Sequence, residues 1–184
     1  NGTSGTELKG KKLGIHAFGQ VGRNVARIAK GFGMEVYAFD PYCPAEAIEA
    51  EGVKPITDIN EMYSTCQYIS LHIPATPETK KSINYNLLKQ MPKGAVLINT
   101  ARKEVIDEEE LVKLMEDRAD FKYISDIKPD NASVFAEKFE GRYFFTPKKM
   151  GAQTAEANIN AGIAAAKQSV GFLKEGIDKF KVNK

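Results

Sequence analysis

The sequence has little of what disulfide-rich, zinc-binding or membrane proteins need. It contains two cysteines and two histidines. Neither Cys43 nor Cys66 stands in a C-x-x-C motif or a Cys/His cluster, which argues against a disulfide framework and a metal site. No apolar run approaches the roughly 18 residues that span a bilayer, and the polar residues 1–12 contain no signal-peptide core. We therefore expect a cytoplasmic protein with free thiols, no metal and no membrane partner.

An excess of charge is also missing. The 26 basic residues nearly balance the 24 acidic ones, and the formal net charge of +2 is too small to suggest a nucleic-acid surface. The hydrophobic share of 42% is enough for one core in a chain of 184 residues. A small molecule or another protein is the expected partner.

Short apolar runs alternate with segments of helical period along most of the chain. The runs are typical of buried parallel strands; they lie at residues 12–18, 35–39, 68–73, 95–100 and 121–126. This alternation predicts an α/β fold, a Rossmann-type doubly wound and mostly parallel sheet.

The intervening helices carry start and stop signals. Asp58 and Asp107 precede helical segments as capping residues, and Gly31 and Gly33 mark the end of the first helix. Two helices show an apolar face: the first with Val21, Val25, Ile28 and Ala29, and a later one with Leu111, Leu114 and Met115.

The two ends differ in character from the middle. Residues 1–10 are rich in Gly, Ser and Thr and indicate a linker, while 152–174 form a long Ala-rich helical pattern followed by a short tail. We expect a dinucleotide-binding domain over residues 11–151. Residues 152–184 would be a helix and tail that reach toward a part of the protein outside this chain.

The first strand runs into a turn that has the context of a dinucleotide fingerprint. Gly19 lets the backbone approach a pyrophosphate, Gly22 lets the helix pack closely on the strand, and the helix N-terminus offers N–H groups. Ala17 stands where the first glycine of G-x-G-x-x-G is usual, which is tolerable if its φ stays negative.

Asp40 completes the fingerprint. It ends the second strand about 20 residues after the turn, where a carboxylate can accept hydrogen bonds from the adenosine ribose. Its charge repels a 2′-phosphate, so NAD is favoured over NADP. Tyr42 and Lys54 lie nearby in the sequence and could weaken this preference. The alternative is that the glycines only make a tight turn and Asp40 only caps the next segment.

With these features in place, the whole chain resembles the D-isomer-specific 2-hydroxyacid dehydrogenases. The matching stretches include ELKGKKLGIHAFGQVGRNVA, LHIPATPETKKSIN, LINTARKEVIDEEEL and TPKKMGAQTAEAN. The resemblance implies further cofactor-side positions: Gln20 and Val21 at the pyrophosphate, then Thr100, Ala101 and Arg102, and Asp126. From their position after the strand at 68–73, Pro74 and Thr76 are expected to line the nicotinamide ribose side, or else to form a simple turn.

The resemblance also implies a substrate role for Arg102. A guanidinium can hold a 2-oxo acid through its carboxylate and carbonyl together, and ligand crevices in open α/β sheets lie at the carboxyl ends of strands. Within the family the likeness is greatest to members that oxidise D-3-phosphoglycerate to 3-phosphohydroxypyruvate, at the entry to serine synthesis. The resemblance also implies a homodimer through the NAD-binding domain. It further implies that the substrate domain is largely absent from this chain, so we do not expect the chain by itself to catalyse the reaction.

Two positions depart from the family pattern. The histidine expected in T-P-H-x-G is replaced by lysine, either Lys148 or Lys149, because this segment is one residue longer. The family's glutamate position holds Asn131, with Asp130 beside it. A lysine that acts as a base must lose its proton, and an adjacent carboxylate would oppose that, so the two changes are compatible. We expect Lys149 or Lys148 to accept the C2 hydroxyl proton.

Other interpretations stay open. A hydroxypyruvate, glyoxylate or D-lactate type reductase is the enzyme alternative, and the loss of the His/Glu pair also fits a non-catalytic NAD-binding regulator. His16 and His72 lie in strands and are interpreted as packed histidines without a catalytic role. Lys103 and Glu104 replace the glycine that commonly follows the arginine in the family.

Overall fold

A computed structural model describes residues 5–179 and residue 181. The first part of the expected linker, residues 1–4, and part of the tail, residues 180 and 182–184, lie outside the described residues. The chain divides into two compact units, one up to Lys148 and one from Lys149 onward. The sequence placed this division after residue 151.

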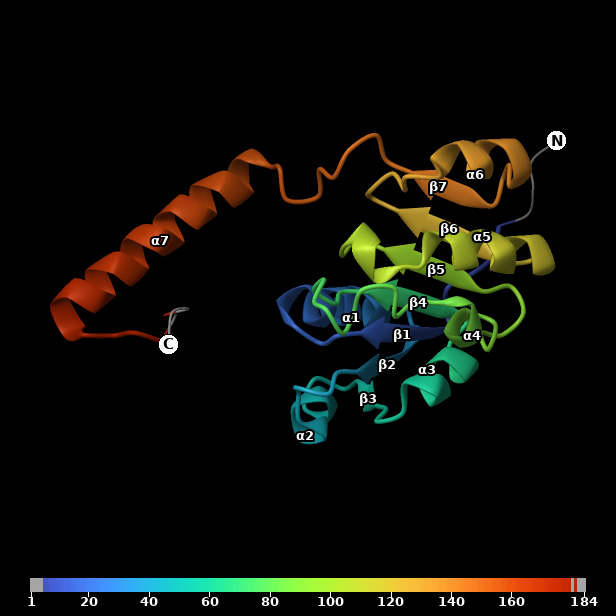
Figure 1. Ribbon diagram of the computed structural model, residues 1–184. Helices are drawn as coiled ribbons and strands as arrows, with labels where there is room; N and C mark the ends of the chain where they lie inside the picture. Colours follow the sequence, from blue (N-terminus) through green and yellow to red (C-terminus); the bar gives the residue numbers. More distant parts are fainter. Residues whose placement is uncertain (1–4, 180, 182–184) are drawn as a thin grey trace. The chain divides into compact units, whose positions relative to one another are not determined.

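The first unit is built on a seven-stranded sheet in the order β3-β2-β1-β4-β5-β6-β7, with every neighbouring pair parallel (Figure 1). The strands are β1 (Lys12–His16), β2 (Glu35–Phe39), β3 (Lys54–Pro55), β4 (Tyr68–Leu71), β5 (Val96–Asn99), β6 (Lys122–Ser125) and β7 (Tyr143–Phe145). The predicted doubly wound α/β fold is confirmed. β3 and β7 were missed because two or three residues are too short to show a period.

Six helices and one 3₁₀ turn connect these strands: α1 (Gln20–Gly31), α2 (Ala45–Glu49), α3 (Ile59–Thr65), α4 (Tyr85–Leu88), η1 (Lys103–Val105), α5 (Glu108–Asp117) and α6 (Ala132–Lys138). The predicted caps are confirmed. The Asp58 carboxylate accepts a hydrogen bond from the backbone N–H of Asn60 at 2.9 Å, and Asp107 accepts one from Glu110 at 3.2 Å. α1 ends at Gly31, as its glycines indicated.

The core lies on both faces of the sheet. One cluster joins β4, β5 and β6 to α3, α4, α5 and α6, and its members include Leu111, Leu114 and Met115 of the predicted α5 face. A smaller cluster joins β1 and β2 to α1 and α2. The carboxyl ends of β1 and β4 are therefore held in position by the helices packed on the sheet.

The apolar face predicted for α1 packs on the sheet only in part. Ala29 is buried and Val25 is half-buried against the smaller core cluster, whereas Val21 and Ile28 are 61% and 58% exposed. Gly22 and Ala26 are buried as well. The reason is steric: a Cβ added at Gly22 would lie 2.5 Å from the Ala17 carbonyl oxygen. Only small residues let α1 approach the strand this closely, so the larger apolar side chains remain on the outside.

The second unit contains one long helix, α7 (Ala155–Glu175), which was predicted over 152–174. Thr154 caps it by accepting a hydrogen bond from the Ala157 N–H at 3.0 Å. None of its residues is buried, and its larger apolar side chains, such as Ile159, Val170 and Leu173, are exposed. Among the described residues, no helix has the length and apolar character needed to cross a bilayer.

Candidate functional site

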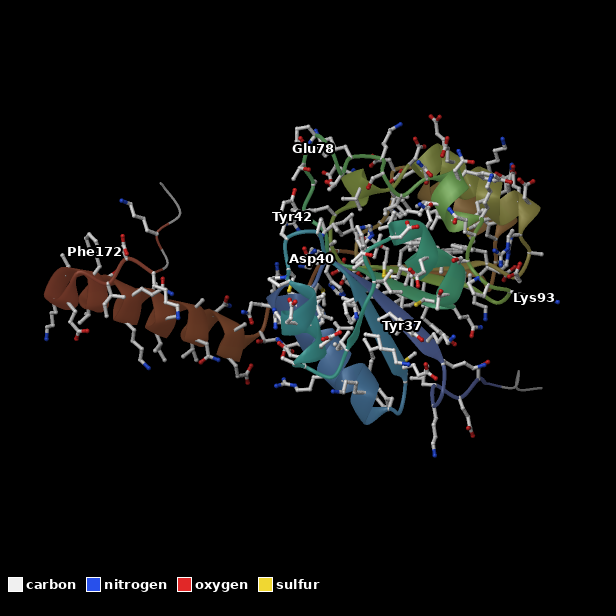
Figure 2. The ribbon with its side chains drawn as sticks, turned by 90° about the horizontal axis from the view of Figure 1, so that it is seen from below. Tyr37, Asp40, Tyr42, Glu78, Lys93 and Phe172 are labelled. Carbon is white, nitrogen blue, oxygen red and sulfur yellow. The ribbon has the colours of Figure 1, made fainter. Side chains whose placement is uncertain are left out.

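The order of the strands reverses between β1 and β4, and a cavity of about 530 Å³ opens there at their carboxyl ends. In open α/β sheets this reversal point is where ligands bind. Figure 2 shows Asp40, Tyr42 and Glu78 at one end of the sheet and Lys93, which precedes β5, at the other. The cavity is lined by residues that follow β1, β2 and β4, among them Gly19, Asp40, Tyr42, Pro74, Thr76 and Glu78.

The turn after β1 holds Ala17 in the left-handed region, at φ +78°. The expectation that Ala17 has a negative φ is therefore wrong. Hydrogen bonds on both sides of the residue impose this conformation: the Ala17 N–H donates to the Phe39 carbonyl at 2.9 Å, and the Phe18 N–H donates to Asp40 Oδ2 at 2.8 Å. Such strain persists where the surroundings determine the backbone.

The two glycines of the turn lie as a phosphate cradle requires. Gly19 lines the cavity, and a Cβ added there would meet no heavy atom within 4 Å. Gly19 is also the N-cap of α1, and no described side chain caps its first turn. The N–H groups at the start of α1 are thus available to an anion, and the helix dipole favours one.

Asp40 follows β2 at the rim of the same cavity. Its two carboxylate oxygens accept separate backbone hydrogen bonds, Oδ2 from Phe18 at 2.8 Å and Oδ1 from Tyr42 at 2.9 Å. The side chain is therefore fixed in position and keeps lone pairs for further donors. A cradle at Gly19 with a fixed acid next to it fits a dinucleotide of the NAD type.

Both histidines lie at this cavity as packed groups. His16 Nδ1 is 3.1 Å from the Tyr63 hydroxyl oxygen, and His72 Nε2 is 2.9 Å from Ser70 Oγ. Burial lowers the pKa of His16 to about 4, and burial also lowers the pKa of His72 to about 4. Both rings are neutral near pH 7, so they give the cavity a polar but uncharged wall.

The loop after β4 is closed by threonines. Thr79 Oγ1 donates to the Pro74 carbonyl at 2.6 Å and accepts from the Thr76 N–H at 2.7 Å. Pro74 and Thr76, which the sequence singled out, are held in the cavity wall by this contact. Thr79 was not singled out, because nothing in a polar loop sequence marks which hydroxyl closes it.

Arg102 follows β5 on a turn shaped by Asn99. The fully buried Asn99 side chain accepts from the Ala101 N–H at 3.0 Å and donates to the Arg102 carbonyl at 3.0 Å. Thr100 and Arg102 are exposed, whereas Ala101 is buried. The sequence analysis missed Asn99, although a polar residue that ends an apolar strand was a usable signal.

The ends of β6 and β7 are tied together beside this turn. The Asp126 N–H donates to the Asn99 carbonyl at 3.2 Å, and the Thr146 hydroxyl lies 2.9 Å from the Asp126 carbonyl and 3.1 Å from the Lys148 carbonyl. Lys148 is thereby placed after β7, at the same edge of the sheet, with an exposed side chain. Lys149 is the first residue of the second unit and is exposed, outside any helix or strand.

The position expected for a glutamate makes structural contacts. Asn131 Nδ2 donates to the Glu108 carbonyl at 3.1 Å, and in the described part of the chain its buried Oδ1 accepts no hydrogen bond. Asp130 forms an ion pair with Lys103, 2.7 Å between Oδ1 and Nζ, which raises the pKa of Lys103. The loop after β6 is thus fastened to η1 and to the start of α5.

Comparisons with known proteins agree with this site. The family model described as "D-isomer specific 2-hydroxyacid dehydrogenase, NAD binding domain" matches residues 1–137. The crystal structure of NAD⁺-bound 3-phosphoglycerate dehydrogenase in Entamoeba histolytica is similar to the whole chain, with 47% identity, a TM-score of 0.87 and 58% of that chain covered.

Two curated relatives extend the comparison. D-3-phosphoglycerate dehydrogenase of Methanocaldococcus jannaschii is 35% identical over 97% of this chain, which covers 34% of that protein. Glyoxylate reductase of Thermococcus litoralis is 33% identical over 98% of this chain, which covers 54% of it. The chain therefore spans between a third and somewhat over half of the length of these proteins.

Proposed function

The chain belongs to the D-isomer specific 2-hydroxyacid dehydrogenases, as part of their NAD-binding domain, and on that premise we propose that the protein oxidises D-3-phosphoglycerate to 3-phosphohydroxypyruvate. The observation that supports this substrate is the 47% identity over the whole chain with the Entamoeba histolytica 3-phosphoglycerate dehydrogenase. Gly19 and Asp40 would hold NAD, which when bound would supply the acceptor for the hydride from C2 of the substrate.

In this proposal Arg102 binds the substrate. Arg102 is exposed at the carboxyl end of β5, its Nη1 donates to the Ala101 carbonyl at 2.9 Å, and its backbone is fixed by the buried Asn99 side chain. A planar guanidinium can hold the carboxylate and the C2 oxygen of a 2-oxo acid at once, and it stabilises negative charge that develops on that oxygen.

A lysine serves as acid and base in the same proposal. Lys148 or Lys149 accepts the proton of the C2 hydroxyl as the hydride leaves, and returns it to the carbonyl oxygen in the reverse reaction. Asp130, the carboxylate beside the former glutamate position, is already paired with Lys103. That pairing supports a lysine that works without a carboxylate partner of the kind that orients a histidine.

The assembly is part of the proposal as well. Serine biosynthesis, a cytoplasmic location and a homodimer through the NAD-binding domain follow from the family resemblance. α1 exposes the apolar side chains of Val21, Ile28 and Phe32 on one side, an area that such an interface would cover.

The test uses the full-length protein that contains this chain. NAD reduction is measured with D-3-phosphoglycerate for the unmodified protein and for Lys148→Ala, Lys149→Ala and Lys128→Ala, the last being an exposed lysine of the loop after β6. We expect one of the first two variants to lose about 10²- to 10⁴-fold in kcat, and Lys128→Ala to keep full turnover. Unaltered turnover in both Lys148→Ala and Lys149→Ala would exclude the lysine mechanism.

Glyoxylate reduction is the second candidate, since the Thermococcus litoralis glyoxylate reductase is 33% identical to the chain. The same assay separates the two when D-3-phosphoglycerate, glyoxylate, hydroxypyruvate and D-lactate are compared by kcat/KM. A protein that binds NAD and acts on none of them would instead be a regulatory relative.

A further inference from the structure

Beside Asp40 lies a second charged group that the cofactor fingerprint does not account for. Arg23, in the second turn of α1, places its guanidinium 4.9 Å from the centre of the Phe18 ring and 3.5 Å from the Cys43 sulfur. Its side chain is 29% exposed. The guanidinium is therefore a half-buried cation packed against Phe18, which follows β1, and Cys43, which follows β2.

The partners of Arg23 are themselves bonded to Asp40. The Phe18 N–H donates to Asp40 Oδ2, and the Cys43 N–H donates to the Asp40 carbonyl at 3.3 Å. The guanidinium thus packs against the same short segments that fix the ribose-binding acid. In Rossmann domains an arginine in this neighbourhood is what accommodates the 2′-phosphate of NADP.

Glu51 engages this guanidinium. Arg23 Nη1 and Glu51 Oε1 form an ion pair at the end of α2, and Lys30 Nζ donates to the Glu51 carbonyl at 2.7 Å, which fixes the backbone there. With Asp40 and Glu51 ionised, the cluster of Asp40, Arg23 and Glu51 carries a formal charge of −1. A 2′-phosphate, which carries about two negative charges, meets repulsion from the two carboxylates and a guanidinium whose charge is already paired with Glu51.

We propose that Glu51 is a second determinant of NAD over NADP, because it occupies the arginine that would otherwise bind a 2′-phosphate. The proposal rests on the cofactor site described above. Asp40 repels the 2′-phosphate directly, whereas Glu51 forms an ion pair with Arg23 and so keeps the guanidinium from binding the phosphate. Since the pair is partly exposed, it adds little to stability, and its main effect is on what Arg23 can bind.

The test compares NADH and NADPH affinities of the purified protein by titration of the nicotinamide fluorescence. The variants are Asp40→Asn, Glu51→Gln and the double substitution, with Glu49→Gln as the matched control, an exposed α2 glutamate that has no ion pair among the described residues. We expect the double variant to bind NADPH about tenfold more tightly than Asp40→Asn, as one freed charge-assisted hydrogen bond would allow. Glu49→Gln added to Asp40→Asn should leave the NADPH affinity unchanged.

A third substitution assigns the gain to Arg23. Adding Arg23→Gln to the double variant should return the NADPH affinity to that of Asp40→Asn. Equal NADPH affinities of Asp40→Asn and the double variant, or an equal gain from Glu49→Gln, would overturn the proposal. Absence of NADH binding in the unmodified protein would contradict the cofactor site itself and is thus a distinguishable result.

Discussion

Ala17 has a strained backbone conformation that contacts from β2 impose on it. The sequence predicted a turn between β1 and α1, and the structure contains it, but an alanine at φ +78° is not visible in a motif. The conformation is imposed from outside, by Phe39 through the Ala17 N–H and by Asp40 through the next one. These contacts come from β2 and its end, so no local reading of the turn could reveal them.

A prediction at this scale is that Ala17→Gly stabilises the protein. The left-handed conformation costs an alanine about 1–2 kcal/mol, and the extra freedom of glycine in the unfolded chain offsets about 0.5–1 kcal/mol of that. We expect a net gain of about 1 kcal/mol in the free energy of unfolding, measured by urea denaturation. Ala26→Gly, at a buried helical position of α1, is the control and should destabilise by about 1 kcal/mol or more. A loss of stability in Ala17→Gly would show that the positive φ carries no strain.

At the scale of elements, apolar runs predicted five strands because buried parallel strands are apolar along their whole length. The α1 helix was harder, because its packing face is defined by small residues and not by large apolar ones. The site residues differ in the same way. Gly19, Gly22 and Asp40 have a local signature, and the Asn99 side chain also acts locally, on Ala101 and Arg102. Thr146 has no such signature, because its hydroxyl bonds the Asp126 carbonyl twenty residues earlier in the chain.

The β5 turn provides the element-scale prediction. Asn99→Leu keeps a similar volume but leaves the Ala101 N–H buried without its acceptor and the Arg102 carbonyl without its donor. One buried unsatisfied group costs about 1–3 kcal/mol, so we expect a loss of about 2 kcal/mol or more in the free energy of unfolding by urea denaturation. Asn24→Leu, at an exposed position of α1, should change it by less than about 0.5 kcal/mol. Equal effects of the two variants would mean that Asn99 does not shape the turn.

At the scale of the whole molecule, the two units differ in how they are stabilised. The sheet unit has two packed faces, whereas α7 has no buried residue among those described. The sequence indicated both, an α/β domain and a helix with little of its own to pack on. The sequence placed the division after residue 151, and the two compact units meet between Lys148 and Lys149, in a segment that has no periodic pattern.

This division predicts the course of limited proteolysis. Lys148 and Lys149 are exposed trypsin sites in a segment without helix or strand, so trypsin should cut there first and leave the sheet unit intact, as seen by mass spectrometry of the fragments.

NAD at one hundred times its Kd should then stabilise the sheet unit by about 2.7 kcal/mol. Degradation of that unit should slow by up to about a hundredfold when it proceeds through unfolding, while the first cut keeps its rate, since its site needs no unfolding. Nicotinamide alone, which cannot reach the Gly19 cradle with a phosphate, is the control and should protect nothing. First cuts within β1 to β6, or equal slowing of both steps by NAD, would show that the chain opens as one body.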